Sequence, residues 1–214
     1  MHTHNHDMEE ILNKYFPNLS PEQIERFEKM AQLFKEENEK VNVVSRKDID
    51  NIEINHILHS LAIAKYLNFT PGSVVIDLGT GGGLPGLPLA VMFPDSHFHL
   101  IDRIGKKVRV AQEIAEKIGL TNVSFQQGDM GECKIKADFV VSRAVTDQPT
   151  LLKISKKNIS DVNKNAIPNG VITLKGGDLR NELGKFFSKS EIVPIESYFS
   201  EPFFKTKEIV FTPV

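Results

Sequence analysis

Residues 77–86 read DLGTGGGLPG and directly follow the apolar run 74–76. Glycines let the backbone turn sharply and approach a ligand closely, because no Cβ stands in the way. A helix expected over 86–93 then places its positive end near that ligand. The pattern of strand, glycine loop and helix is typical of nucleotide-binding α/β domains, although a tight turn without a ligand has the same spacing. The loop therefore predicts both the fold class and a binding site.

Strand and helix patterns alternate beyond this loop. We expect further strands at 98–102, 123–126, 139–142 and 171–174, and a helix over 106–118 that ends at Gly119. Such alternation predicts an open, mostly parallel α/β sheet. The tail differs, because two β-type runs, 191–199 and 206–212, follow each other without an intervening helix. They predict an antiparallel hairpin at the edge of the sheet.

Helical patterns precede the first strand. Ser20, Pro21 and Gln23 form a helix start in which Ser20 caps and Gln23 reaches back. Apolar residues then recur at helical spacing, and a second helix is expected over 52–67. We therefore expect one domain, with an N-terminal helical extension (8–70) and an α/β core (71–214). The histidine-containing segment 1–7 is interpreted as a tag remnant or disordered end rather than a metal site.

Composition limits the functions open to the chain. Its 214 residues are 40% hydrophobic and 25% charged, as in soluble globular proteins, and no apolar run approaches the length of a membrane span. The single cysteine, Cys133, excludes an internal disulfide, favours a cytoplasmic location, and is interpreted as a half-buried thiol without a catalytic role. A net charge of -2 argues against coating nucleic acid through overall charge, so an RNA partner requires a local basic face.

Two acids favour S-adenosylmethionine as the ligand of the glycine loop. Asp77 ends the first strand, where a methionyl ammonium group would lie and where the pyrophosphate of NAD would be repelled. Asp102 ends the next strand, where a carboxylate can accept both hydroxyls of an adenosine ribose. NAD enzymes share the second feature, so Asp102 indicates a ribose rather than one cofactor. Aspartates that simply terminate strands are the alternative for both positions.

Several motifs together resemble the bacterial ribosomal RNA small subunit methyltransferase G family, also called the glucose-inhibited division protein B family. They occur in the same order over about 38–177, and LPGLP after the glycine loop is unusual among methyltransferases. The motifs are DLGTGGGLPGLP (77–88), NHILHSL (55–61), GKKVR (105–109), VSRA (141–144) and LKGG (174–177). Asn55, His59 and Gly82 stand where the family usually has Arg, Asp and Pro. The His59 change puts any RNA-side role of that element in doubt.

The resemblance implies a Rossmann-like class I methyltransferase with a seven-stranded sheet. It also implies transfer of a methyl group from S-adenosylmethionine to N7 of a guanine in 16S ribosomal RNA, which forms 7-methylguanosine. The partner would be small-subunit ribosomal RNA or the small ribosomal subunit. With the two acids and the loop, the expected cofactor-binding residues are Asp77, Gly79, Gly81, Leu84, Asp102, Met130, Gly131 and Arg143.

Methylation of guanine N7 needs no general base, because this nitrogen carries a lone pair and no proton at neutral pH. Orientation and proximity can supply the catalysis. We therefore assign no catalytic residue or metal ligand, and keep His56 and Arg143 as candidates. His56 is more simply a hydrogen-bonded structural residue, and Arg143 is a binder of the cofactor carboxylate or an RNA phosphate. The expected RNA-binding residues, each also interpretable as ordinary solvated surface, are Lys106, Lys107, Arg109, Lys175 and Arg180.

Three alternatives remain open from the sequence. A methyltransferase acting on a small molecule or a protein would share the cofactor half of the chain. An NAD-dependent oxidoreductase would bind NADH and not S-adenosylmethionine. A non-enzymatic RNA-binding module would bind RNA without the cofactor and would lack transfer activity.

Overall fold

The computed structural model describes residues 7–143 and 145–214 and contains a seven-stranded sheet in the order β3-β2-β1-β4-β5-β7-β6. The strands are β1 (Val74–Leu78), β2 (His97–Asp102), β3 (Val123–Gln127), β4 (Phe139–Arg143), β5 (Gly170–Gly176), β6 (Glu191–Pro194) and β7 (Lys207–Pro213). Strands β1 to β5 pair in parallel, while β7 pairs antiparallel with both β5 and β6. The predicted mostly parallel sheet is confirmed.

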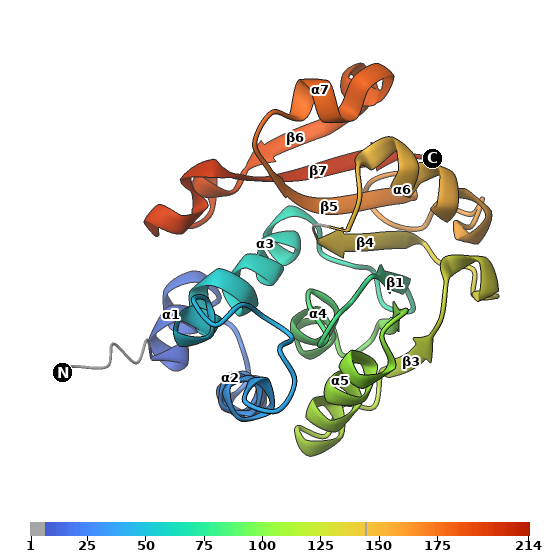
Figure 1. The fold of residues 1–214 in the computed structure, drawn as a ribbon. Helices are drawn as coiled ribbons and strands as arrows, with labels where there is room; N and C mark the ends of the chain where they lie inside the picture. Colours follow the sequence, from blue (N-terminus) through green and yellow to red (C-terminus); the bar gives the residue numbers. More distant parts are fainter. Residues whose placement is uncertain (1–6, 144) are drawn as a thin grey trace.

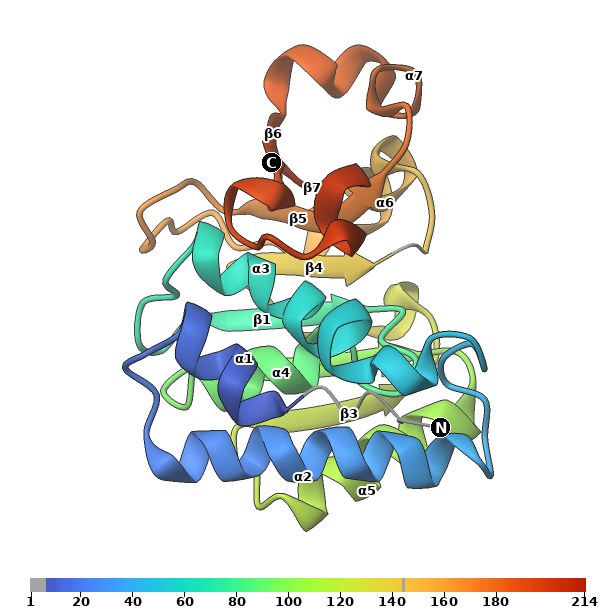
Figure 2. The ribbon, with the colours of Figure 1, turned by 90° about the vertical axis from the view of Figure 1, so that its left-hand side faces the viewer.

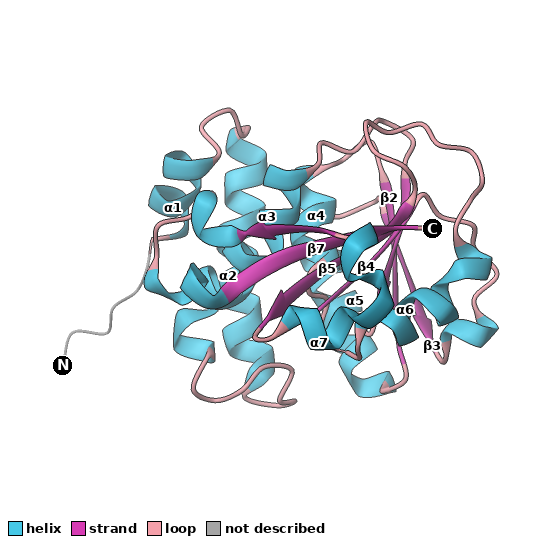
Figure 3. Cartoon of the chain, turned by 90° about the horizontal axis from the view of Figure 1, so that it is seen from above, coloured by secondary structure: helices cyan, strands magenta, loops and turns pink. Residues whose placement is uncertain are grey.

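Helices cover both faces of the sheet (Figures 1 and 3). The α-helices are α1 (Met8–Tyr15), α2 (Pro21–Asn38), α3 (His59–Tyr66), α4 (Gly86–Met92), α5 (Gly105–Lys117), α6 (Gln148–Ser155) and α7 (Leu179–Leu183). Figure 2 shows α1, α2 and α3 in front of the strands, on the side away from α6. Because both faces are covered, the central strands β1 and β4 are apolar except near their carboxyl ends.

Two apolar clusters form most of the core. The larger lies between the sheet and helices α1 to α5, and includes Phe27, Leu61 and Phe98, all with no exposed surface. The smaller lies on the opposite face, where it includes Val140 of β4 and Leu151 of α6. Cys133 belongs to this smaller cluster, is buried and has no disulfide partner. Short helices α6 and α7 and several 3-10 turns cover this face, and α7 packs its Leu179 and Leu183 against Val210 of β7.

The N-terminal helices agree with the sequence at the cap and differ in detail. The Gln23 amide donates to Ser20 Oγ at 3.1 Å, and the Ser20 amide donates to Gln23 Oε1 at 3.0 Å, which confirms the predicted capping box. The helix predicted over 52–67 begins with the π-helical turn Glu53–Leu58 and becomes α-helical only in α3. Helices α1, α6 and α7 have no counterpart in the prediction, because short helices carry little periodic signal.

The predicted C-terminal hairpin is confirmed, with one correction. β6 ends at Pro194 rather than at Phe199, and a 3-10 turn, Ile195–Ser197, follows it. Proline has no amide hydrogen to donate to a neighbouring strand, so the β-type run cannot continue through it. A further 3-10 turn, Pro202–Thr206, leads into β7, which inserts between β5 and β6.

Residues 1–6 and Ala144 lie outside the described residues, and with them most of the histidine-containing segment and the last position of the VSRA motif. No helix in the described part of the chain is long and apolar enough to cross a membrane.

Candidate active site

The glycine loop folds over a buried carboxylate. Asp77 has no exposed surface, and its Oδ2 accepts hydrogen bonds from Thr80 Oγ1 at 2.6 Å and from the Gly86 amide at 2.8 Å. Its Oδ1 is buried without a hydrogen-bond partner. Burial raises the pKa of Asp77 to about 7, although both hydrogen bonds act in the opposite direction. Asp77 thus binds the first amide of α4 and holds the loop closed from beneath.

A cavity of about 540 Å³ opens above this loop, and we call it the glycine-loop cavity. It lies at the carboxyl ends of β1, β2 and β3 and is closed on one side by α6. The residues that line it include Gly79, Asp102, Ile104, Met130, Val145, Thr146, Thr150 and Ile154. The sheet order reverses between β1 and β4, and open α/β sheets bind ligands at such a switch point.

The walls of this cavity expose unusual amounts of apolar surface. In the described part of the chain five large hydrophobic side chains are exposed, and three of them line it. These are Ile104 (43% exposed), Val145 (46%) and Ile154 (39%). Singly exposed apolar residues need no explanation, but three that converge on one cavity mark a ligand site. The arrangement suits a flat, largely apolar group such as a purine ring.

Asp102 supplies a polar end to the same cavity. Its Oδ2 accepts the Gly81 amide at 2.8 Å, and its Oδ1 accepts the Ile104 amide at 2.9 Å. Each oxygen keeps a second lone pair. The two backbone amides fix the orientation of the carboxylate, so that it can accept a pair of hydroxyl groups.

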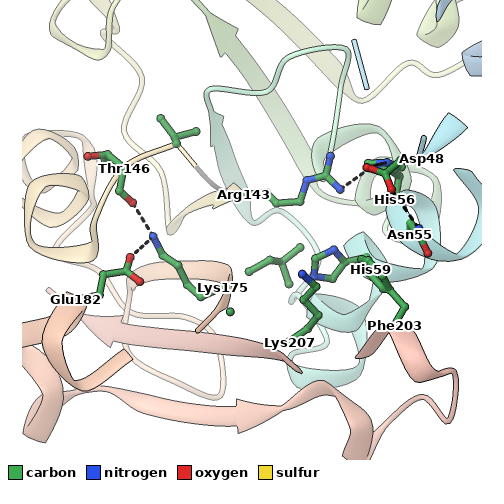
Figure 4. Close-up of a pocket in the computed structure, with 13 residues that line it drawn as sticks. Asp48, Asn55, His56, His59, Arg143, Thr146, Lys175, Glu182, Phe203 and Lys207 are labelled. Carbon is green, nitrogen blue, oxygen red and sulfur yellow. Dashed lines mark hydrogen bonds and ion pairs between the residues drawn. The ribbon is translucent and has the colours of Figure 1, made fainter. Parts of the chain in front are cut away.

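A second cavity, of about 610 Å³, adjoins the first, and we call it the arginine cavity (Figure 4). Val145 and Thr146 line both cavities and therefore separate them. The π-helical turn and α3 supply Asn55, His56 and His59, β4 supplies Arg143, and the C-terminal strands supply Lys175 and Lys207. Segments that are far apart in the sequence thus meet at the carboxyl end of the sheet.

Arg143 and His56 are directly bonded. Arg143 Nη1 donates to His56 Nδ1 at 2.8 Å, and His56 Nε2 lies 4.0 Å from Asp48 Oδ2. Because Nδ1 accepts, the neutral ring carries its proton on Nε2. Burial, helped by the charge of Arg143, lowers the pKa of His56 to about 4. Burial also lowers the pKa of Arg143 to about 10, so the guanidinium stays charged at neutral pH.

His59 occupies the adjacent wall. Its ring is buried and meets the ring of Phe203 edge to face, with centroids 5.4 Å apart. Burial lowers the pKa of His59 well below its usual value, and its Nε2 has no partner in the structure. His59 therefore places a neutral imidazole in the wall of the arginine cavity.

Lys175 is held within the protein. Its side chain is 7% exposed, and its Nζ donates to the Thr146 carbonyl at 2.6 Å and pairs with Glu182 Oε1 at 2.7 Å. Figure 4 shows Lys175 bridging these two groups. Lys175 therefore fixes the segment that separates the two cavities, and its predicted contact with RNA remains a prediction.

The other predicted residues divide among several places. Gly79, Asp102 and Met130 line the glycine-loop cavity, while Arg143 and His56 line the arginine cavity. The residues that line neither cavity are Asp77, Gly81, Leu84 and Gly131. Their cofactor contacts stay predictions, and within the protein Asp77 Oδ2 already accepts the amide of Gly86 at the start of α4.

The five predicted RNA-binding residues lie on two separate groups of elements, and their contacts with RNA stay predictions. Lys106, Lys107 and Arg109 lie on α5, which packs beside β2 and β3, whereas Lys175 and Arg180 belong to β5 and α7. Three strand spacings, roughly 14 Å, separate β2 from β5. The glycine-loop cavity lies between the two groups.

Sequence reasoning missed Asp48, Val145 and Thr146. Asp48 lies in an irregular segment without a motif, and Val145 and Thr146 become important only through the packing of the β4–α6 loop.

The sequence also left the role of the N-terminal extension open. Val43 packs against Gly82, where a Cβ on the glycine would lie 2.8 Å from Val43 Cβ. The extension therefore covers the glycine loop directly.

Known proteins with a similar sequence agree with the kind of site that this geometry indicates. A family model for rRNA small subunit methyltransferase G matches residues 23–204. Ribosomal RNA small subunit methyltransferase G of Bacteroides thetaiotaomicron is 52% identical over 205 residues, covering 96% of this chain and 100% of that protein. The protein of the same name from Phocaeicola vulgatus is 51% identical over 205 residues, covering 96% of this chain and 98% of that protein.

Among solved structures, that of M. jannaschii TYW2 in complex with AdoMet superimposes with a TM-score of 0.53 and 17% identity, covering 75% of this chain and 77% of that chain. This likeness shows a shared fold. The sequence matches extend over nearly the whole chain and confirm the resemblance drawn from the motifs. The chain belongs to the rRNA small subunit methyltransferase G family.

Proposed function

We propose that this chain transfers a methyl group from S-adenosylmethionine to N7 of a guanine in 16S ribosomal RNA. Family membership supports the reaction class and the RNA acceptor. The observation that carries the proposal is the pair of cavities that adjoin at Val145 and Thr146. One cavity suits an adenosine, and the other is polar and opens beside it, so that a methyl donor and an acceptor base can meet across a short boundary.

The residues of the glycine-loop cavity fit the adenosine half of the cofactor. Ile104, Ile154 and Met130 would hold the adenine between apolar surfaces, and Asp102 would accept the ribose hydroxyls. The Gly79 backbone lies where the chain of the cofactor would pass toward Val145. A Cβ at Gly79 would lie 2.3 Å from Val145 Cγ2, so only glycine fits this position without displacing that side chain.

The arginine cavity would receive the guanine and a neighbouring anionic group. Arg143 is charged and held by His56, so its remaining N–H groups can bind a phosphate or the cofactor carboxylate. His59 and Phe203 offer an apolar wall with one unpartnered ring nitrogen. Lys175 would keep the boundary segment in place through the Thr146 carbonyl.

S-adenosylmethionine supplies a methyl group on a positively charged sulfur, and the bond to sulfur breaks as the bond to guanine N7 forms. No group of the chain has to remove a proton, because N7 has none at neutral pH. His56 is therefore a positioning residue: its Nδ1 accepts from Arg143 and its lowered pKa keeps the ring neutral. The chain acts by orienting the two reactants, which can lower the barrier by several kcal/mol. The substrate places this reaction in the cytoplasm.

The proposal is tested with labelled S-adenosylmethionine and small ribosomal subunits from cells that lack this activity. After incubation, the RNA is digested and the labelled nucleoside identified. We expect the label in 7-methylguanosine. Label in another nucleoside, in ribosomal protein or in a small molecule would overturn the proposed acceptor, and the absence of cofactor binding would overturn the whole proposal.

A further inference from the structure

A groove of about 560 Å³ runs along the other side of α6, and we call it the lysine groove. It lies between α6 and the 3-10 turn Gly184–Lys189, with the end of β7 at its base. Its basic lining residues are Lys153, Lys156, Lys185 and Lys189, and Phe186, Pro149, Thr150 and Pro213 line it as well. All four lysines are exposed, whereas Phe186 is half-buried.

The positive charge of this groove is not offset by nearby acids. No Asp or Glu side chain lines it, and none of its four lysines pairs with a carboxylate within 4.0 Å in the described part of the chain. Some lysines elsewhere do pair with acids, as Lys35 does with Glu53 at 2.8 Å. Because the whole chain has a net charge of -2, these four lysines form a local basic region that the overall charge does not reveal.

Two further lysines lie outside the groove, near the end of α6. Lys157 belongs to the 3-10 turn Lys156–Asn158 that follows this helix, and its Nζ donates to the Gly131 carbonyl at 3.0 Å. Lys136 donates to the Lys157 carbonyl. Both lysines bond to backbone carbonyls rather than to acids, so their charges add to that of the groove.

The groove lies next to the proposed reaction site. Thr150 on α6 lines both the lysine groove and the glycine-loop cavity, and Val145 and Thr146 link that cavity to the arginine cavity. The three hollows therefore follow one another around the start of α6. A polymer whose base enters the arginine cavity can continue over this helix into the groove.

We propose that the lysine groove binds the sugar-phosphate backbone of the substrate RNA, on the opposite side of α6 from the cofactor. Exposed ammonium groups without acidic partners are suited to phosphates, and their binding releases the counterions of the RNA. The ring of Phe186, with Lys185 Nζ 5.2 Å from its centroid, gives an unpaired base a surface on which to stack. This inference rests on the proposed function and extends the RNA-binding face beyond the residues predicted from the sequence.

The test compares two triple variants that remove equal charge. Lys153→Gln, Lys185→Gln and Lys189→Gln empty the groove of three charges, while Lys14→Gln, Lys29→Gln and Lys40→Gln remove three exposed lysines from the N-terminal helical side. Binding of deproteinised 16S ribosomal RNA is measured against salt concentration with S-adenosylhomocysteine present, and methyl transfer to small subunits is measured in parallel. Unfolding midpoints confirm that both variants fold.

We expect the groove variant to bind the RNA at least about tenfold more weakly, and its plot of log affinity against log salt to lose a slope of about 2. KM for subunits should rise while kcat and the affinity for S-adenosylhomocysteine stay unchanged. The matching Lys→Arg triple variant should restore binding, and the helical-side variant should behave as wild type.

Equal losses in the two glutamine variants would overturn the inference, because they would show an effect of total charge. Unchanged RNA binding with weaker use of subunits would also overturn it and would assign the groove to a ribosomal protein. If the wild type methylates RNA and the groove variant equals it in RNA binding and in KM for subunits, the inference fails while the proposed function stands. If the wild type transfers no methyl group to RNA, the proposed function fails with it.

Discussion

Replacing Gly79 tests whether the loop and Val145 together shape the cofactor site. Gly79 has φ +71°, and an alanine Cβ there would lie 2.3 Å from Val145 Cγ2. The left-handed backbone costs an L-residue about 1–2 kcal/mol. Val145 is 46% exposed and can turn away, so the contact should cost little stability. Instead, it should push the side chain toward the space where the cofactor passes.

Gly119→Ala provides the matched control. Gly119 has φ +77°, and a Cβ there would meet nothing within 4 Å, so this variant carries the backbone cost without the contact. Urea unfolding should show that both variants lose about 1–2 kcal/mol, equivalent to a fall in Tm of about 2–8 °C. Calorimetry with S-adenosylhomocysteine should show an affinity at least about tenfold lower for Gly79→Ala alone.

Adding Val145→Ala to Gly79→Ala should then restore much of the affinity and none of the stability. Equal losses of affinity in the two glycine variants would refute the reasoning, because the contact with Val145 would then be irrelevant. Failure of Val145→Ala to restore binding would refute it as well.

Three further predictions concern charged groups. Asp102→Asn should lower the affinity for S-adenosylhomocysteine about tenfold or more in calorimetry, since hydrogen bonds to a charged group contribute about 1.5–3 kcal/mol each; unchanged affinity would remove Asp102 from the ribose site. The folded-state pKa of His56, about 4, lies below its usual value of 6.5, so its contribution to stability is complete above pH 6.5 and is lost as the pH falls toward 4, by at most about 3 kcal/mol. Because the raised pKa of Asp77 acts in the opposite direction over nearly the same pH range, the check is the difference between the two proteins: the unfolding free energy of wild type should fall relative to that of His56→Gln as the pH is lowered from 6.5 to 4. Lys175→Met should destabilise the chain by about 2 kcal/mol in urea unfolding, and adding Glu182→Gln should recover part of it; a neutral Lys175→Met would show that the pair is not structural.

The sequence predicts the sheet well where the residues of a single segment determine its secondary structure. The apolar runs of β1 and β4 are typical of strands covered on both faces, and the loop after β1 has glycines at the positive-φ positions 79, 81 and 83, which other residues rarely adopt. Ser20 and Gln23 predicted the start of α2 because both partners of a capping box lie within one turn. Each of these signals lies within a few neighbouring residues, so a single sequence is enough to detect it.

The site was less predictable because its contacts join distant segments. Arg143 and His56 are bonded across 87 positions of sequence, and Lys175 reaches the Thr146 carbonyl from another strand. Sequence spacing places Asp77 at the end of β1, but only the structure shows that its side chain turns beneath the loop. The lysines of the lysine groove are likewise scattered along the chain and become one surface only when α6 and the turn after α7 pack together.

The most direct test of the proposed site is a crystal structure of the chain with S-adenosylhomocysteine bound. We expect the adenine between Ile104, Ile154 and Met130, the ribose hydroxyls on Asp102, and the sulfur near Val145, facing the arginine cavity. Adenosine bound outside the glycine-loop cavity, or a sulfur that faces away from the arginine cavity, would contradict the account.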